Sequence, residues 1–159
     1  MPYKPDSLDD GIWGQLIEAM EKRIRSATPT HNERKPFVIA GDDWNPPEQI
    51  QGSYRLVQIR EAGDSLPVFA GNGQSWNVDG IVDVTIYYDR KRMKGRNAVG
   101  GAHSAMMRDA RQMREILFSR FTLTGGNVRV FNGEVTPLED KFMRAVNISF
   151  RVQGYAESP

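Results

Sequence analysis

The stretch WNVDGIVDVTIYY, residues 76–88, has the clearest strand pattern in the chain. Its apolar side chains fall on one face, at Trp76, Val78, Val82, Val84, Ile86 and Tyr88. Its polar side chains fall on the other face, at Asn77, Asp79, Asp83 and Thr85. Because successive side chains of a strand point to opposite faces, this alternation predicts a long strand with one packed face and one face that is wet or partnered.

Residues 143–153 repeat this alternation and predict a second long strand at the end of the chain. The apolar side chains of this segment are Val146, Ile148, Phe150 and Val152. Shorter strands are predicted at 37–40, 53–61 and 128–131. Loops are predicted where proline and glycine gather, at 41–52, 62–75 and 132–140, because proline cannot donate to a strand ladder and glycine favours turns.

Two segments have the apolar spacing of amphipathic helices. Residues 8–27 carry one stripe, with Ser7 as the expected N-cap, and its members are Ile12, Trp13, Leu16, Ile17, Ala19, Met20 and Ile24. Residues 102–121 carry the other stripe, formed by Met106, Ala110, Met113, Leu117 and Phe121. The sequence TGGN at 124–127 is predicted to end this second helix, because glycine is favoured just after a helix C-terminus.

The order of these elements predicts an α+β fold. Most strands are joined by short turns, so the sheet should be mostly antiparallel, and two helices should cover its apolar face in a two-layer sandwich. The 159 residues suit a single domain spanning 1–159.

Composition excludes several classes of site. The chain has no cysteine, so disulfides, thiol nucleophiles and cysteine-bound metal centres are excluded. The formal net charge is only +1, so any electrostatic attraction to a nucleic acid must be local. No apolar run approaches the ~20 residues needed to span a bilayer, and residues 1–10 lack the apolar core of a signal peptide. We therefore expect an intracellular protein with no membrane partner.

Candidate catalytic residues are few. The two histidines, His31 and His103, belong to no recognised catalytic motif and are expected to be surface residues. The acidic pairs Asp9–Asp10 and Asp42–Asp43 suit a helix N-terminus and a loop better than a metal site. We expect no enzymatic activity, no cofactor and no bound metal.

The strongest local feature is a concentration of basic residues between the long strand and the second helix. It consists of Arg90, Lys91, Arg92, Lys94, Arg96, Arg108, Arg111 and Arg114. Asp109 is the only acidic residue between Arg90 and Arg114. Such a cluster can attract phosphates, although the loop at 90–96 contains no aromatic residue to stack on bases. A solvated loop, a contact with DNA backbone and a contact with an acidic protein surface all remain open.

The layout as a whole resembles the tail terminator, or tail-completion, proteins of long-tailed bacteriophages. The shared plan is an amphipathic helix, a short strand, a Pro/Gly-rich loop, a long alternating strand, a second helix and a closing strand pair. The matching pieces are IWGQLIEAMEKRI, FVIA, GDDWNPPEQ, WNVDGIVDVTIYYD, ARQMREILFSRF and RAVNISFRVQGY. The resemblance covers nearly the whole chain and rests on element order rather than on an invariant motif.

This resemblance implies a structural role in the virion. Such proteins form a ring, typically hexameric, on the head-proximal end of the tail tube, stop tube polymerisation and present a surface for the head–tail connector. DNA passes through the lumen without sequence recognition, so the implied partners are other copies of the chain, the major tail tube protein, the connector and DNA. The alternatives are a neck or head–tail adaptor subunit and a DNA-binding accessory protein that uses Arg90–Arg114.

Overall fold

The computed structural model describes residues 8–27, 37–39, 55–64, 68–69, 75–89, 101–139 and 143–157. Two helices occur in these ranges, α1 (Leu8–Ser26) and α3 (Gly101–Leu117). The strands are β1 (Val38–Ile39), β2 (Leu56–Asp64), β3 (Val68–Phe69), β4 (Ser75–Asp89), β5 (Ser119–Leu123), β6 (Gly126–Glu139) and β7 (Met143–Glu157).

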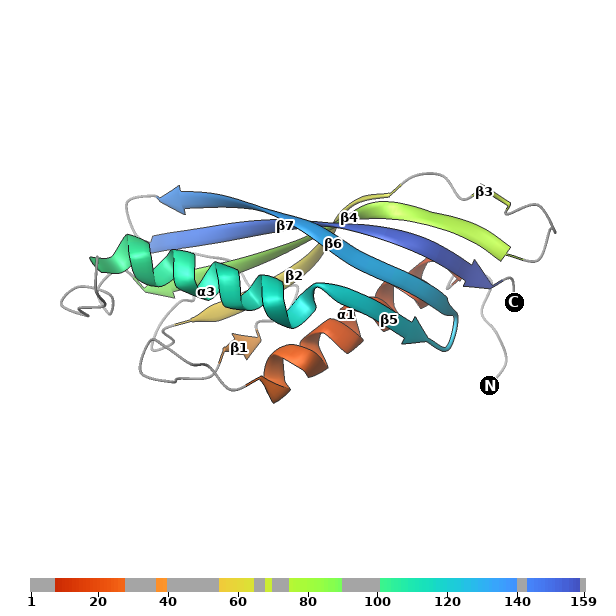
Figure 1. Ribbon diagram of the computed structural model, residues 1–159, viewed down its shortest axis with the longest axis horizontal. Helices are drawn as coiled ribbons and strands as arrows, with labels where there is room; N and C mark the ends of the chain where they lie inside the picture. The colour runs from red at the N-terminus through yellow and green to blue at the C-terminus, as the bar shows by residue number, and fades with distance from the viewer. Residues whose placement is uncertain are drawn as a thin grey trace.

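Among the described residues, the strands form one seven-stranded sheet in the order β1-β2-β4-β7-β6-β5, with β3 also paired to β4. The two long strands predicted from alternation lie side by side at its centre. They pair from Ser75–Glu157 at one end to Asp89–Met143 at the other. Figure 1 shows α1 and α3 on the same side of this sheet, while β4, β6 and β7 run along the length of the molecule.

The core lies between the two helices and the apolar face of the sheet. The stripe of α1 is buried at Ile12, Trp13, Leu16, Met20 and Ile24, and that of α3 at Met106, Ala110, Met113 and Leu117. The sheet contributes Val78, Val82, Val84, Ile86 and Tyr88 from β4 and Val146, Ile148, Phe150 and Val152 from β7. The predicted inward faces are therefore confirmed where the side chains are described, and burial of this apolar surface stabilises the fold.

The prediction of an α+β fold with a mostly antiparallel sheet and two covering helices is confirmed. The simple two-layer sandwich is not, because the sheet is mixed and curled. β1 pairs in parallel with β2, whereas every other described pair is antiparallel. Long strands accumulate twist, and the bulges at Glu61–Gly63 and Asn132–Glu134 add to it.

The second predicted helix is too long at its C-terminal end. α3 ends at Leu117, and residues 119–123 form β5 instead. Phe121 is buried as predicted, but it reaches the core from a strand in which it alternates with exposed Arg120 and Thr122. The glycine pair at 125–126 accordingly closes the β5–β6 hairpin rather than capping the helix.

The loop predicted at 132–140 is also wrong, because β6 continues to Glu139. Asn132 and Gly133 have positive φ angles of 76° and 67° and form a bulge rather than a turn. Pro137 is tolerated because β5 pairs with β6 only as far as Val130, so the other side of β6 has no described strand beyond this point. The loop predicted at 62–75 likewise contains the short strand β3.

Glycine at position 80 allows α1 to approach the sheet closely. A Cβ built there would lie 2.7 Å from two atoms of the Trp13 ring and would also meet the carbonyl oxygen of Gly63. The bare backbone of β4 thus forms the surface on which the indole packs.

No helix in the described ranges is long and apolar enough to cross a membrane.

Candidate functional site: a polar groove on the open face of the sheet

The structure tests only part of the predicted basic cluster. Five of its members lie outside the described residues, namely Arg90, Lys91, Arg92, Lys94 and Arg96. Ser7, His31, Asp42 and Asp43 also lie outside them. His103 is exposed on the first turns of α3, and the groups of His, Asp and Glu in the described ranges include none that could hold a metal ion.

The remaining three basic residues lie on α3. Arg111 is exposed, and Arg108 and Arg114 are half-buried. The Arg114 side chain runs over the β6 bulge, where a Cβ at Gly133 would lie 3.1 Å from both its Cγ and its Nε. These arginines therefore belong to the helical side of the sheet and do not reach the sheet's opposite, open face.

Asp109, the one acid within the basic stretch, lies in the core rather than on the surface of α3. It is fully buried and forms a bidentate ion pair with Arg55, at 3.1 Å from Nε and 2.8 Å from Nη2. The Tyr88 hydroxyl also donates to it at 2.6 Å, and the Arg55 guanidinium stacks 4.0 Å from the centroid of the Phe37 ring. This network joins α3 to β4 and to Arg55, the residue just before β2, in the core, where a buried charge must be paired.

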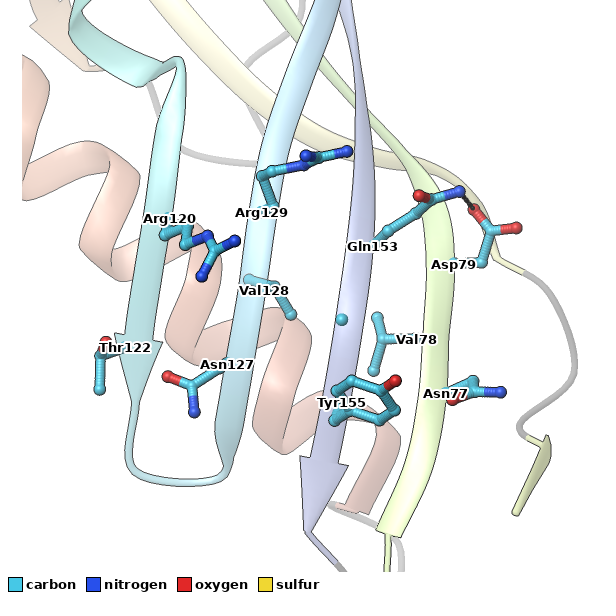
Figure 2. A pocket seen from close by; sticks show the side chains of 11 residues that line it. Asn77, Val78, Asp79, Arg120, Thr122, Asn127, Val128, Arg129, Gln153 and Tyr155 are labelled. Carbon is cyan, nitrogen blue, oxygen red and sulfur yellow. Dashed lines mark hydrogen bonds between the residues drawn. The ribbon is translucent and has the colours of Figure 1, made fainter. Parts of the chain in front are cut away.

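A groove of about 760 Å³ lies on the open face of the sheet. Figure 2 shows its lining side chains on β5, β6, β7 and β4, with α1 behind the strands. The lining residues are Asn77, Val78, Asp79, Arg120, Thr122, Asn127, Val128, Arg129, Gln153, Gly154 and Tyr155. Eight of these residues hold outward positions on four adjacent strands, and Val78, Val128 and Gly154 hold the core-facing positions between them.

Strand register arranges the outward residues into two rows across the sheet. The arginine row consists of Arg120, Arg129, Gln153 and Asp79. The tyrosine row consists of Thr122, Asn127, Tyr155 and Asn77. Tyr155 is 56% exposed, so its ring stands on the surface beside the arginine row.

The two ends of the arginine row differ in charge balance. At one end, Asp79 accepts from Arg151 Nη2 at 3.3 Å and from Gln153 Nε2 at 3.5 Å. At the other end, Arg120 and Arg129 are directly opposite each other on β5 and β6. Arg129 stacks 4.4 Å from the centroid of the Phe131 ring, but within the described part of the chain neither guanidinium has an ion pair. Like charges facing each other across a strand pair repel, so this end of the row carries uncompensated positive charge.

The middle of the open face, by contrast, satisfies its own polar groups. Thr85 Oγ1 donates to Asn147 Oδ1 at 2.9 Å, and Asn147 Nδ2 donates to Ser149 Oγ at 3.2 Å. Ser149 Oγ in turn donates to Asp83 Oδ1 at 2.6 Å. Burial raises the pKa of the nearby Tyr87 hydroxyl, against the opposing effects of the Arg60 charge and a hydrogen bond with Thr85. The groove is thus distinguished by its unneutralised cations.

Sequence reasoning missed Arg120, Arg129 and Tyr155. Arg120 was predicted to be helical, and Tyr155 lies beyond the predicted end of the last strand. A signal was present around Arg129, because Asn127, Arg129 and Phe131 alternate with Val128 and Val130. Which side chain faces Arg129 depends on strand pairing, which alternation does not specify.

Comparisons with known proteins assign no family to the chain. No family model matches it, and no curated protein matches it. A solved structure whose name states no function is similar over 89% of this chain and 94% of its own length, with 20% sequence identity and a TM-score of 0.49. A likeness at this level carries no argument about function.

Proposed function

We propose that the chain is a virion structural protein that forms a ring on the head-proximal end of a long-tailed bacteriophage tail tube. There it ends tube polymerisation and provides the docking surface for the head–tail connector. The observation that carries this proposal is element order. A helix, a short strand, a long central strand, a second helix and closing strands occur in this order around one sheet, as in the plan of tail terminator proteins.

Exposed edges and apolar side chains are compatible with assembly into a ring. β5 lies at one end of the sheet, and residues 131–139 of β6 extend past it without a second described strand neighbour. Leu138 on this edge is 47% exposed, and Phe118, just before β5, is 54% exposed. A cyclic ring joins two different surfaces of the same chain, and unpaired strand edges readily accept a partner.

Electron microscopy of particles made without the gene for this chain tests the proposal. Overlong tails that are detached from heads are the expected result, because nothing would then stop the tube from growing. Tails of normal length that fail to join filled heads would instead indicate that the protein is an adaptor subunit of the neck. Intact infectious virions would overturn both structural roles.

A DNA-binding accessory protein is a second candidate, and one observation favours it. The groove presents two unneutralised arginines beside an exposed tyrosine. This feature is also compatible with a ring subunit through which DNA passes. In either candidate, the two arginines would be available to contact DNA.

A further inference from the structure

We infer that the open-face groove binds the sugar–phosphate backbone of a nucleic acid, with Arg120 and Arg129 holding phosphate and Tyr155 packing against a base or sugar. The inference deepens the proposed function, on which its biological setting rests, by naming the residues that meet DNA. They are distinct from Arg108, Arg111 and Arg114 of the predicted basic cluster, because α3 lies on the other side of the sheet.

The β5–β6 strand pair contains a repulsion between like charges. Arg120 and Arg129 are directly opposite residues of an antiparallel ladder, so their side chains leave the same face side by side. The only acid lining the groove within the described residues is Asp79, at the far end of the row, and Arg151 already pairs with it. An anion bound between the two guanidinium groups would remove this repulsion.

The two arginine side chains have the geometry of oxyanion donors. Each guanidinium presents a planar fork of N–H groups that matches the oxygens of a phosphate or carboxylate. Stacking on Phe131 orients the Arg129 fork. Arg23 of α1 donates from Nη2 to the backbone carbonyl of Arg120 at 3.3 Å, which ties β5 to the helix below it. The donors therefore stand on a supported strand pair rather than on a loop.

The exposed Tyr155 ring favours a nucleic acid over an acidic protein segment as the ligand. The tyrosine row lies next to the arginine row and places the exposed Tyr155 ring between polar Asn77 and Asn127, with Thr122 beyond Asn127. Aromatic rings beside cations on an open sheet suit single strands, whose bases stack on the ring while arginine meets the phosphates. A duplex would use the phosphate contacts with Tyr155 against a sugar, whereas a carboxylate-rich peptide would leave the tyrosine unused. Nothing in the rows sets up a base-specific pattern, so binding should be independent of sequence.

The deciding variant is Arg120→Glu in the full chain. It places a negative charge opposite Arg129. The new glutamate should pair with the Arg129 guanidinium in place of a phosphate, and the cross-strand repulsion becomes an attraction. Fluorescence anisotropy with labelled single-stranded and duplex oligonucleotides, at low and physiological ionic strength, measures binding. The thermal midpoint measures the fold.

We expect Arg120→Glu to weaken binding to both oligonucleotides by at least about tenfold at low salt. The slope of log affinity against log salt should fall by about one for each arginine lost. The thermal midpoint should stay level or rise. Tyr155→Leu should weaken binding to the single strand more than to the duplex, because only the single strand offers an unpaired base to stack.

Lys22→Glu is the matched control, because Lys22 is an exposed residue of α1 and the change in charge is the same. Equal losses in Lys22→Glu and Arg120→Glu would show a dependence on net charge alone and overturn the inference. So would wild-type protein that binds neither oligonucleotide. If only Arg111→Glu loses DNA binding, the DNA contact lies on α3 instead. If polyglutamate displaces the labelled oligonucleotide as well as unlabelled DNA does, the groove binds an acidic protein surface.

These outcomes are separable from those of the tail experiment. If Arg120→Glu leaves DNA binding unchanged while loss of the gene gives overlong tails, only the groove assignment fails. If the groove binds DNA but virions without the protein are intact, the structural role fails and the DNA-binding role remains.

Discussion

At the scale of single residues, Asp109 shows that the effect of a charged side chain depends on where it lies in the fold. In the sequence it is the one acid among many basic neighbours, and it would be expected to moderate their field. In the structure it is buried and bonded to Arg55, a residue 54 positions away, and to Tyr88. Its role is to fix α3 against β4 and against the residue that precedes β2.

Replacing Asp109 with asparagine should therefore destabilise the protein strongly. Asparagine nearly keeps the shape but removes the negative charge that faces the buried Arg55 guanidinium, and removing one partner of a buried pair costs about 3–5 kcal/mol. Urea unfolding followed by circular dichroism measures the change in the free energy of unfolding.

Asp79→Asn provides the comparison for this prediction. It makes the same chemical change in the partly exposed Asp79–Arg151 pair, whose loss should cost less than about 1 kcal/mol. Similar losses at the two positions would contradict a special role for the buried pair. The double variant Arg55→Met/Asp109→Leu should recover much of the stability, because it removes both charges together.

At the scale of elements, the wrong end of the second helix and the wrong loop at 132–140 have a common cause. Leu117 and Phe121 have helical spacing, and Asn132–Gly133 is a strong turn signal. Both signals are local, and both were overridden by strand pairing: Phe121 is buried from β5, and Asn132–Gly133 becomes a bulge within β6. The long strands and the body of each helix were predictable because their patterns extend over many residues and agree with the final burial.

The contact between α1 and β4 gives a test at this scale. Gly80→Ala should cost about 1–3 kcal/mol, because the added Cβ would overlap the Trp13 ring and the Gly63 carbonyl and force the helix away from the sheet. Gly14→Ala should instead stabilise the protein by about 0.5–1 kcal/mol, because a Cβ there meets no atom within 4 Å and alanine favours the helix. Thermal unfolding of the two variants should show a lower midpoint for Gly80→Ala and a higher midpoint for Gly14→Ala. Midpoints that shift in the same direction would contradict the packing described.

At the scale of the whole molecule, the sheet is well covered on one face and incomplete along one edge. The β6 segment at 131–139 pairs with β7 on one side only, within the described residues, and exposes Leu138. An apolar side chain on an unpaired edge is exposed to water in a monomer, and it can be buried when the subunit assembles with another chain. The same molecule carries the arginine pair on its open face, away from both helices.

Leu138→Lys should prevent self-association and leave the fold intact. A charged side chain on an edge opposes strand pairing with another chain, whereas a substitution at an exposed position changes stability by only about 0.5 kcal/mol. Analytical ultracentrifugation over a range of concentrations measures the assembly. Ile81→Lys is the control, because Ile81 is also exposed but belongs to the interior strand β4. Unchanged assembly in Leu138→Lys, or equal loss in both variants, would exclude this edge as the interface.

The sequence by itself determined the class of fold, the two helices, the two central strands and the side chains that form the core. These follow from the period of apolar residues, which each segment carries within itself. Only the tertiary structure decided that Arg120 faces Arg129, that Asp109 meets Arg55 and that Gly80 receives Trp13. Each of these contacts joins residues from different elements, and the choice of neighbour depends on how the whole chain packs and how its strands are aligned. The candidate site consists of such contacts, and for this reason its residues differ from the basic run that stands out in the sequence.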